Sequence, residues 1–225
     1  MKTTILYILT FLVSLSASAQ ADTTAWTSAW GGSIGVGFGH RLLNNSNELF
    51  SDEEEAYDSL ELASFAFYAE LNYVRRLNAH LRFNGGLGLM HLGYRVDSIP
   101  DAGIEKMQLS FNYGVVPLKL QWISNESKPV AFTSSVGLVP MFLLKQNTHV
   151  SYIGDSKTDT FDTKSDKNGF GVSAHISAGI EAVALKNYRL SAELMYRQAL
   201  TPTSDGDMHR LLNVAGITFS IIKTL

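Results

Sequence analysis

A two-residue alternation of apolar with polar or small side chains constrains the fold of this 225-residue sequence more than any other feature. In the stretch 170–182, every even position is apolar, and the odd positions hold glycine, serine, histidine and glutamate. Successive side chains of a β-strand point to opposite faces, so this pattern predicts a strand with one apolar face. The pattern recurs over 33–39, 64–74, 81–89, 107–122, 131–145, 188–196 and 211–221. We therefore expect eight antiparallel strands and an all-β fold.

The connections between the predicted strands differ in length. Short turns fall near 76–80, 123–129 and 185–187, and longer loops span about 41–61, 94–106, 146–168 and 201–209. Short turns at one end and long loops at the other are typical of an up-and-down barrel of the outer membrane. Ten residues at ~3.3 Å each, tilted by ~45°, cover roughly 23 Å, which is close to the apolar band of such barrels. The prediction is an eight-stranded antiparallel up-and-down transmembrane β-barrel, with a soluble sandwich or lipocalin-like carrier as the alternative.

Aromatic residues stand near the strand ends on the apolar face. Aromatic rings concentrate at membrane–water interfaces, where they form girdles around membrane barrels. Near the short turns we expect a girdle of Trp30, Tyr73, Phe83, Trp122, Phe132, Tyr188 and Phe219. Near the long loops we expect a second girdle of Phe38, Phe65, Phe111, Phe142, Phe170 and Tyr196. A sandwich core gives aromatic rings no reason to avoid the middle of a strand, so this placement favours a membrane barrel.

The stretch 107–122 is the least regular of the predicted strands. Its apolar residues lie at odd positions as far as Tyr113 and at even positions from Val116 onward. A β-bulge inserts one residue and shifts the alternation in this way. Pro117 is tolerated at a bulge because no ladder N–H is needed there. The sequence therefore predicts a bulge at 114–117.

The polar face of the strands carries charged residues that a narrow barrel must bury. An eight-stranded barrel is only wide enough for side chains to fill it. The predicted interior charges are Glu70, Glu181, Glu193, Arg82, Lys119 and Arg197, with His175, Gln121 and Asn84 as further hydrogen-bonding groups. Buried charges need partners, so we expect an ion-pair network with a structural role. The alternative is the lining of a gated pore.

The N-terminus has the layout of a secretory signal peptide. Lys2 supplies a basic start, residues 5–13 are apolar apart from Thr10, and small residues at 17–19 indicate cleavage before Gln20. We expect a signal peptide over 1–19, a short segment over 20–27 and the barrel domain over 28–225. With the barrel pattern, this predicts a location in the bacterial cell outer membrane.

Composition and motifs exclude several functions. Lys and Arg number 18 against 21 Asp and Glu, a net charge of −3, so there is no basic excess for nucleic acid. Without cysteine, the chain has no disulfide, thiolate metal site or cysteine nucleophile. The six histidines show no metal-ligand spacing, and no phosphate loop is present, so we expect no metal and no cofactor.

One pair of residues resembles a nucleophile and its base. His175 and Ser177 share the polar face of one strand, as a lipid-modifying barrel enzyme would require. A two-residue repeat separates such side chains by ~6–7 Å, and no orienting acid is fixed by the sequence. We therefore predict no enzymatic activity and keep lipid modification as a lesser alternative.

Two segments resemble a known family. Residues 111–122 (FNYGVVPLKLQW) are similar to the Y-x-x-I/V-P-L-x-L-x-Y strand of the outer-membrane β-barrel (porin-like) family common in Bacteroidota. Residues 193–201 (ELMYRQALT) resemble its R-Y-x-x-G-L-T segment, with Ala199 in place of glycine. The chain ends in Thr224-Leu225, where the family commonly has an aromatic residue. The resemblance implies a membrane barrel and is nearly silent about activity.

These observations predict a structural or surface-binding protein with a plugged interior. The loops 41–61 and 146–168 carry clustered acidic residues and are the expected binding sites. The expected partners are outer-membrane lipids, the barrel-assembly machinery and an unknown surface ligand. A small-solute porin is the alternative function.

Overall fold

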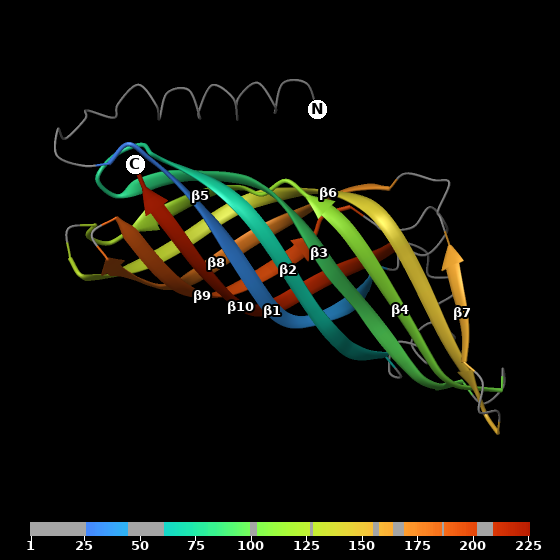
Figure 1. The fold of residues 1–225 in the computed structure, drawn as a ribbon. Helices are drawn as coiled ribbons and strands as arrows, with labels where there is room; N and C mark the ends of the chain where they lie inside the picture. The colour runs from blue at the N-terminus through green and yellow to red at the C-terminus, as the bar shows by residue number, and fades with distance from the viewer. Residues whose placement is uncertain are drawn as a thin grey trace.

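Figure 1 shows the computed structural model, which describes residues 26–44, 61–99, 103–126, 128–154, 158–163, 169–185, 187–201 and 209–225. The predicted signal peptide lies outside these residues. The strands are β1 (Ser28–Asn44), β2 (Glu61–Arg76), β3 (Leu81–Ile99), β4 (Ile104–Val115), β5 (Leu118–Ile123), β6 (Val130–Tyr152), β7 (Thr158–Thr163), β8 (Phe170–Leu185), β9 (Tyr188–Ala199) and β10 (His209–Thr224). Among these residues, no helix is long and apolar enough to span a membrane.

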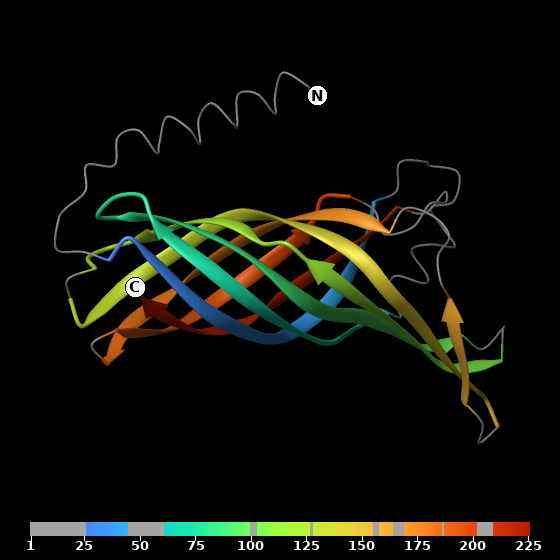
Figure 2. The ribbon, with the colours of Figure 1, turned by 45° about the horizontal axis from the view of Figure 1, so that its top comes forward.

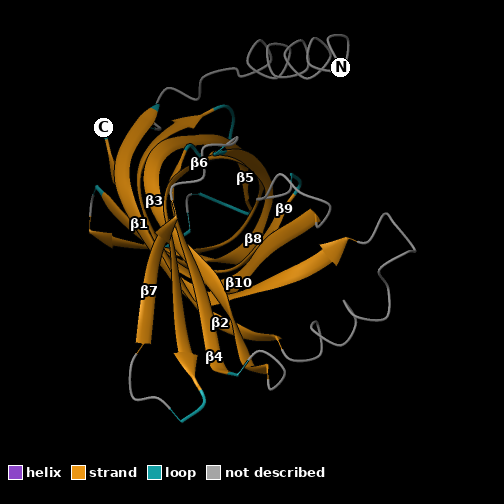
Figure 3. Ribbon diagram, turned by 90° about the vertical axis from the view of Figure 1, so that its right-hand side faces the viewer, coloured by secondary structure: helices purple, strands orange, loops and turns teal. Residues whose placement is uncertain are grey.

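Antiparallel pairing closes the strands into a ring. β1 pairs with both β2 and β10, and the ring continues through β3, β4 with β5, β6, β8 and β9. β4 and β5 together form one strand position of the ring, because each pairs with β3 on one side and with β6 on the other. The ring therefore has the eight places that the alternation predicts, and Figure 3 views it end-on.

The bulge predicted at 114–117 is wrong. Val115 lies opposite Gly88 and Leu118 opposite Gly85, so no residue is inserted against β3. The strand is interrupted there because Pro117 cannot donate to the ladder, although its carbonyl accepts from the Gly86 amide at 3.1 Å. The extra residue is in β6 instead, where Leu144 lies between the partners of Asn112 and Tyr113.

Several predicted loops are largely strand. β3 runs for 19 residues and β6 for 23, so the expected loops 94–106 and 146–168 contain the ends of β3 and β6, the start of β4, and β7. β7 lies outside the ring and pairs with the outer part of β6. The outer ends of these strands differ in pattern: in β3 the alternation continues, with Leu92, Tyr94 and Val96 on the buried face, whereas residues 146–152 of β6 are mostly polar and carry little periodic signal. Figure 2 shows them continuing past the ring.

The barrel interior has a polar half and an apolar half. Toward the long loops it is filled by a buried cluster of Ala66, Tyr68, Met90, Leu92, Tyr94, Val96, Leu109, Phe111, Tyr113, Val115, Val139, Met141, Met195, Leu212 and Val214. The prediction that Phe111 belongs to an aromatic girdle is therefore wrong, because its side chain faces the interior and is only 4% exposed. Odd positions face inward along both β4 and β5. In β4 the apolar side chains lie on the inner face, and in β5 they lie on the outer face. The sequence alone cannot distinguish this change from a bulge.

Candidate functional site in the barrel interior

The first layer of charges lies at the short-turn end of the barrel. Arg82 is fully buried and donates to Glu181 through Nη1–Oε2 at 2.7 Å and Nη2–Oε1 at 3.0 Å. It also donates to Glu126, whose second oxygen lies 2.8 Å from Nε of Arg76. Arg189 donates to Glu181 Oε1 at 2.9 Å and to the Glu126 carbonyl at 3.0 Å. Three guanidinium groups thus share two carboxylates, drawn from β2, β3, β8, β9 and the β5–β6 turn.

Trp26 covers this layer on its outer side. Its ring lies 4.9 Å from Cζ of Arg82, within the range of a cation–π contact. The side chain also packs against a small buried cluster of Ala29, Val74 and Ile222. Because Glu126 comes from the turn and Trp26 precedes β1, the short-turn end is closed by side chains from outside the strands.

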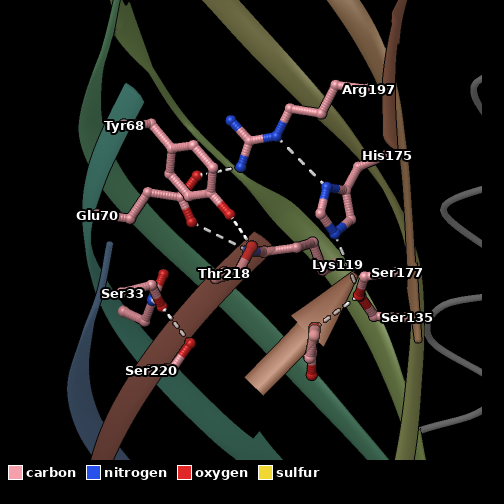
Figure 4. Close-up of polar contacts among 12 residues, drawn as sticks. Ser33, Tyr68, Glu70, Lys119, Ser135, His175, Ser177, Arg197, Thr218 and Ser220 are labelled. Atoms are coloured by element: carbon pink, nitrogen blue, oxygen red, sulfur yellow. Dashed lines mark hydrogen bonds and ion pairs between the residues drawn. The ribbon is translucent and has the colours of Figure 1, made fainter. Parts of the chain in front are cut away.

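A second layer surrounds Glu70, as Figure 4 shows. The Glu70 carboxylate accepts from Nζ of Lys119 at 3.0 Å and from Nη2 of Arg197. Cζ of Arg197 lies 4.2 Å from the centre of the Tyr68 ring, and the Tyr68 hydroxyl is hydrogen-bonded to Thr218. Two cations on one buried carboxylate balance its charge at the boundary with the apolar half.

Glu193 is held by neutral donors among the described residues. Gln121 Nε2 donates to Oε1 at 3.0 Å, Thr133 Oγ1 donates to Oε1 at 3.1 Å, and Ser177 Oγ donates to Oε2 at 2.6 Å. Several donors to a charged carboxylate replace much of the hydration that it loses on burial. Glu193 therefore links strands β5, β6, β8 and β9 through hydrogen bonds, with no direct ion pair among the described residues.

A chain of hydrogen bonds connects the last two groups (Figure 4). Nε of Arg197 donates to Nδ1 of His175 at 3.3 Å, so the imidazole carries its proton on Nε2. Nε2 lies 3.3 Å from Oγ of Ser135, which lies 2.6 Å from Oγ of Ser177. Ser177 donates onward to Glu193. The donors point in one direction from cation to carboxylate, an arrangement in which each bond strengthens the next.

The same contacts bear on the histidine–serine pair. In a serine nucleophile system, a carboxylate accepts from Nδ1 of the histidine and stabilises the imidazolium that forms. Here Nδ1 of His175 faces the cation Arg197, which disfavours a second positive charge. His175 is also only 3% exposed and contacts Ser135 rather than Ser177. This geometry does not suit His175 to act as a general base.

The free space in the polar half is small. A cavity of about 20 Å³ is lined by Ser33, Asn72, Asn84, Lys119, Gln121, His175, Glu193 and their neighbours. This volume accommodates about one water molecule. Oδ1 of Asn72 and of Asn84 have no hydrogen-bond partner in the described structure, so the expected contribution of Asn84 is limited.

All seven residues predicted for the interior network face the interior, but they form two groups in the described structure: Arg82 with Glu181, and Glu70, Lys119, His175, Glu193 and Arg197. Sequence reasoning missed Arg76, Glu126 and Arg189 as members. Arg76 and Arg189 lie on the same face of their strands as Asn72 and Ser191, so the alternation could have predicted that they face the interior. No signal marked Glu126, because a turn has no periodicity.

The predicted short-turn girdle faces away from the interior. Trp30, Trp122, Phe132 and Phe219 are exposed, and Tyr73, Phe83 and Tyr188 are partly exposed. The rings of Trp30 and Tyr73 lie 5.0 Å apart, and those of Trp122 and Phe132 lie 6.2 Å apart.

No group of three or more metal-ligating side chains occurs in the described part of the chain.

The family now follows from this architecture and from a sequence match. Residues 18–205 match the family described as "Outer membrane protein beta-barrel domain". The chain belongs to this family. It is therefore a protein of the bacterial outer membrane, and the strands of its ring are transmembrane β-strands. Comparison with curated proteins finds no match.

Solved structures of outer-membrane barrels are similar in fold. Neisserial surface protein A is 10% identical, with 88% of this chain and 96% of that chain covered and a TM-score of 0.47. The N-terminal barrel of Pseudomonas aeruginosa OprF is 11% identical, with 87% and 98% covered and a TM-score of 0.38. Ail of Yersinia pestis is 13% identical, with 87% and 99% covered and a TM-score of 0.34.

Proposed function

We propose that this outer-membrane barrel does not conduct solutes and instead presents a binding surface outside the membrane. The observation that carries the proposal is the filled interior. The two charged layers close the short-turn half, and Tyr94, Phe111 and the rest of the apolar cluster fill the other half. The side chains that fill the interior therefore have a structural role, which is the role that we expected for the interior ion-pair network from the sequence.

The apolar half adds a barrier of a different kind. An ion that enters it must leave its water without gaining polar partners, which costs several kcal/mol or more. Movement of the charged layers alone would not open a path, because the apolar side chains beyond them would still exclude water. This argument disfavours the small-solute porin.

The binding surface is the sheet that continues beyond the ring. β6 is 23 residues long, whereas roughly 9–11 residues suffice for a strand to cross the membrane. Its outer part pairs with β4 on one side and with β7 on the other, and Figure 3 shows β7 directed away from the ring. This sheet contains most of the loop 146–168 that we expected to bind a ligand. Of the other expected loop, 45–60 lies outside the described residues.

Conductance tests the first half of the proposal. The purified protein is inserted into planar lipid bilayers, with folding checked by its heat-dependent shift on a gel. We expect no stepwise current in potassium chloride. Regular current steps from the folded protein would overturn the proposal and support a porin.

Removal of the projecting hairpin tests the second half. Gln146 and Thr163 lie opposite each other, so a short turn between them deletes the outer hairpin and leaves the ring intact. Cells displaying either form are applied to surfaces coated with gelatin, polylysine or dextran sulfate. We expect the full chain to promote adhesion to at least one coating and the shortened chain to lose it. Equal adhesion by both forms would overturn this surface as the binding site.

A further inference from the structure

The lipid-facing side of the barrel has an apolar groove over β1. Its volume is about 830 Å³, and it is lined by outward side chains of β1, β2, β3, β9 and β10, including Ile34, Leu71, Leu87, Leu190 and Ile221. Its floor on β1 has no side chain at Gly32. Gly32 lies between Leu71 of β2 and Ile221 of β10 in the register. In Figure 1, β10, β1 and β2 lie side by side on this face.

Gly32 is not required by crowding. A Cβ atom at this position would meet a single atom within 4 Å, the carbonyl oxygen of Glu70 at 3.6 Å, which is ordinary contact. The interior-facing Gly35 differs, because its Cβ would lie 2.1 Å from an atom of the Tyr68 ring. The space above Gly32 is thus free, and a side chain placed there would project into the groove.

Aromatic residues and a cation border the groove on its short-turn side. The next outward-facing row of the sheet is Tyr73, Trp30, Lys223 and Tyr188, because Trp30 pairs with both Tyr73 and Lys223, and Lys223 pairs with Tyr188. Nζ of Lys223 lies 6.0 Å from the centre of the Tyr188 ring. Trp and Tyr rings occupy the level of lipid headgroups, so this row marks the membrane interface.

A second cation follows one step farther out. Arg75 lies two residues beyond Tyr73 on the same face of β2, opposite Ser28 of β1. Arg75 and Lys223 are exposed, and neither forms an ion pair with a carboxylate in the described structure. They flank β1 with Cα atoms on the order of 12 Å apart, from strand spacing and rise. Two long cationic side chains at this separation can reach one phosphate group between them.

We infer that this face binds one anionic phospholipid of the inner leaflet, with an acyl chain in the groove and its phosphate between Arg75 and Lys223. Short turns of such barrels face the periplasm, so this interface contacts the inner leaflet. Arg and Lys both bind phosphate oxygens through charge-assisted hydrogen bonds. The uncharged groove and the two unpaired cations match the two parts of such a lipid.

Native mass spectrometry tests the site on the full-length protein, delipidated in detergent. Phosphatidylglycerol and phosphatidylcholine with the same chains are added separately. We expect the wild type to retain one phosphatidylglycerol in preference to phosphatidylcholine. Each basic residue at an anionic surface contributes about fivefold in affinity. Arg75→Gln and Lys223→Gln should each reduce the preference by about that factor, and the double variant by about 25-fold.

Two further variants separate the parts of the site. Lys128→Gln removes an exposed cation from the β5–β6 turn and should retain the wild-type preference. Gly32→Leu places a side chain in the middle of the groove, with its Cβ at ordinary contact distance from the backbone, and should weaken retention of both lipids, with folding verified by the gel shift. Glycerol phosphate, which has the charge but no chains, should leave no bound adduct.

Several results would overturn the inference. Equal retention of the two lipids by the wild type overturns the selection of an anionic headgroup. An unchanged preference in the double variant removes Arg75 and Lys223 from the site. If glycerol phosphate forms adducts with the wild type and Gly32→Leu retains lipid as the wild type does, the site binds free phosphate instead of a phospholipid. A wild-type dimer that Gly32→Leu disrupts, with lipid retention unchanged, makes the groove a contact between two copies of the chain.

Discussion

Arg82 and Glu181 form a two-point ion pair across the barrel interior, with oxygen–nitrogen distances of 2.7 and 3.0 Å. They lie 99 positions apart in the chain, on β3 and β8, which are not neighbours in the ring. The backbone ladder joins each strand only to the next. Interior ion pairs of this kind therefore connect opposite walls of the barrel.

Loss of the Arg82 guanidinium should destabilise the fold strongly. Arg82→Met leaves Glu181 with Arg189 and Glu126 with Arg76, at a site that excludes water. Each carboxylate keeps one guanidinium group, so the cost is that of the lost hydrogen bonds to Arg82, and a hydrogen bond to a charged group contributes about 1.5–3 kcal/mol. We expect a decrease of this size in the free energy of unfolding, measured by urea titration of the vesicle-inserted protein. Arg95→Gln is the matched control, because its pair with Asp97 is more than a third exposed and should contribute less than about 1 kcal/mol. Similar losses in both variants would contradict the buried network.

Glu70 should couple energetically to Lys119. Glu70→Gln leaves two buried cations without their carboxylate, so we expect a loss of about 3–5 kcal/mol in the free energy of unfolding. Removal of one of those cations by Lys119→Met should restore part of it, with a coupling energy of about 0.5–3 kcal/mol. A double-mutant cycle of four proteins measures the coupling. Additive losses would show that the two groups do not interact.

The two glycines of β1 should respond differently to the same substitution. Gly35→Ala places a methyl group 2.1 Å from the Tyr68 ring and must displace it from Arg197, at a cost of about 1–3 kcal/mol. Gly32→Ala enters open space and should change the free energy of unfolding by less than about 0.5 kcal/mol. Thermal gel-shift midpoints of the two variants compare them directly. Equal midpoints would mean that the ring does not occupy the space beside Gly35.

Spin labels can distinguish the inner from the outer face of the strands. The chain has no cysteine, so Phe111→Cys and Phe142→Cys each create a single labelling site. Oxygen dissolves preferentially in lipid, so a label at the exposed Phe142 should relax rapidly in its presence. A label at the buried Phe111 should be shielded. Equal oxygen accessibility at the two sites would contradict the inward direction of Phe111.

The fold class follows from the sequence because alternation is a local property. Over 170–182 in β8, apolar residues at every even position and polar residues or glycine at every odd position define both faces without reference to other strands. The same local rule placed Glu70, His175 and Arg197 together on the inner face. Charges of opposite sign confined to a narrow interior must then find each other, so a network was predictable even though its pairs were not.

Tertiary structure decided what the local pattern leaves ambiguous. Along β4 and β5 the inward parity is constant, and only the closed ring shows that Phe111 faces an apolar interior while Trp122 faces lipid. The outer part of β6 is mostly polar and forms a strand because β4 and β7 pair with it. Glu126 enters the network from a turn, and Gly32 becomes the floor of a groove only when β2 and β10 flank it. The two-residue alternation determines which face of its strand a side chain lies on, because successive residues point to opposite sides. The neighbours that the side chain meets on that face are decided by the strands that close the ring.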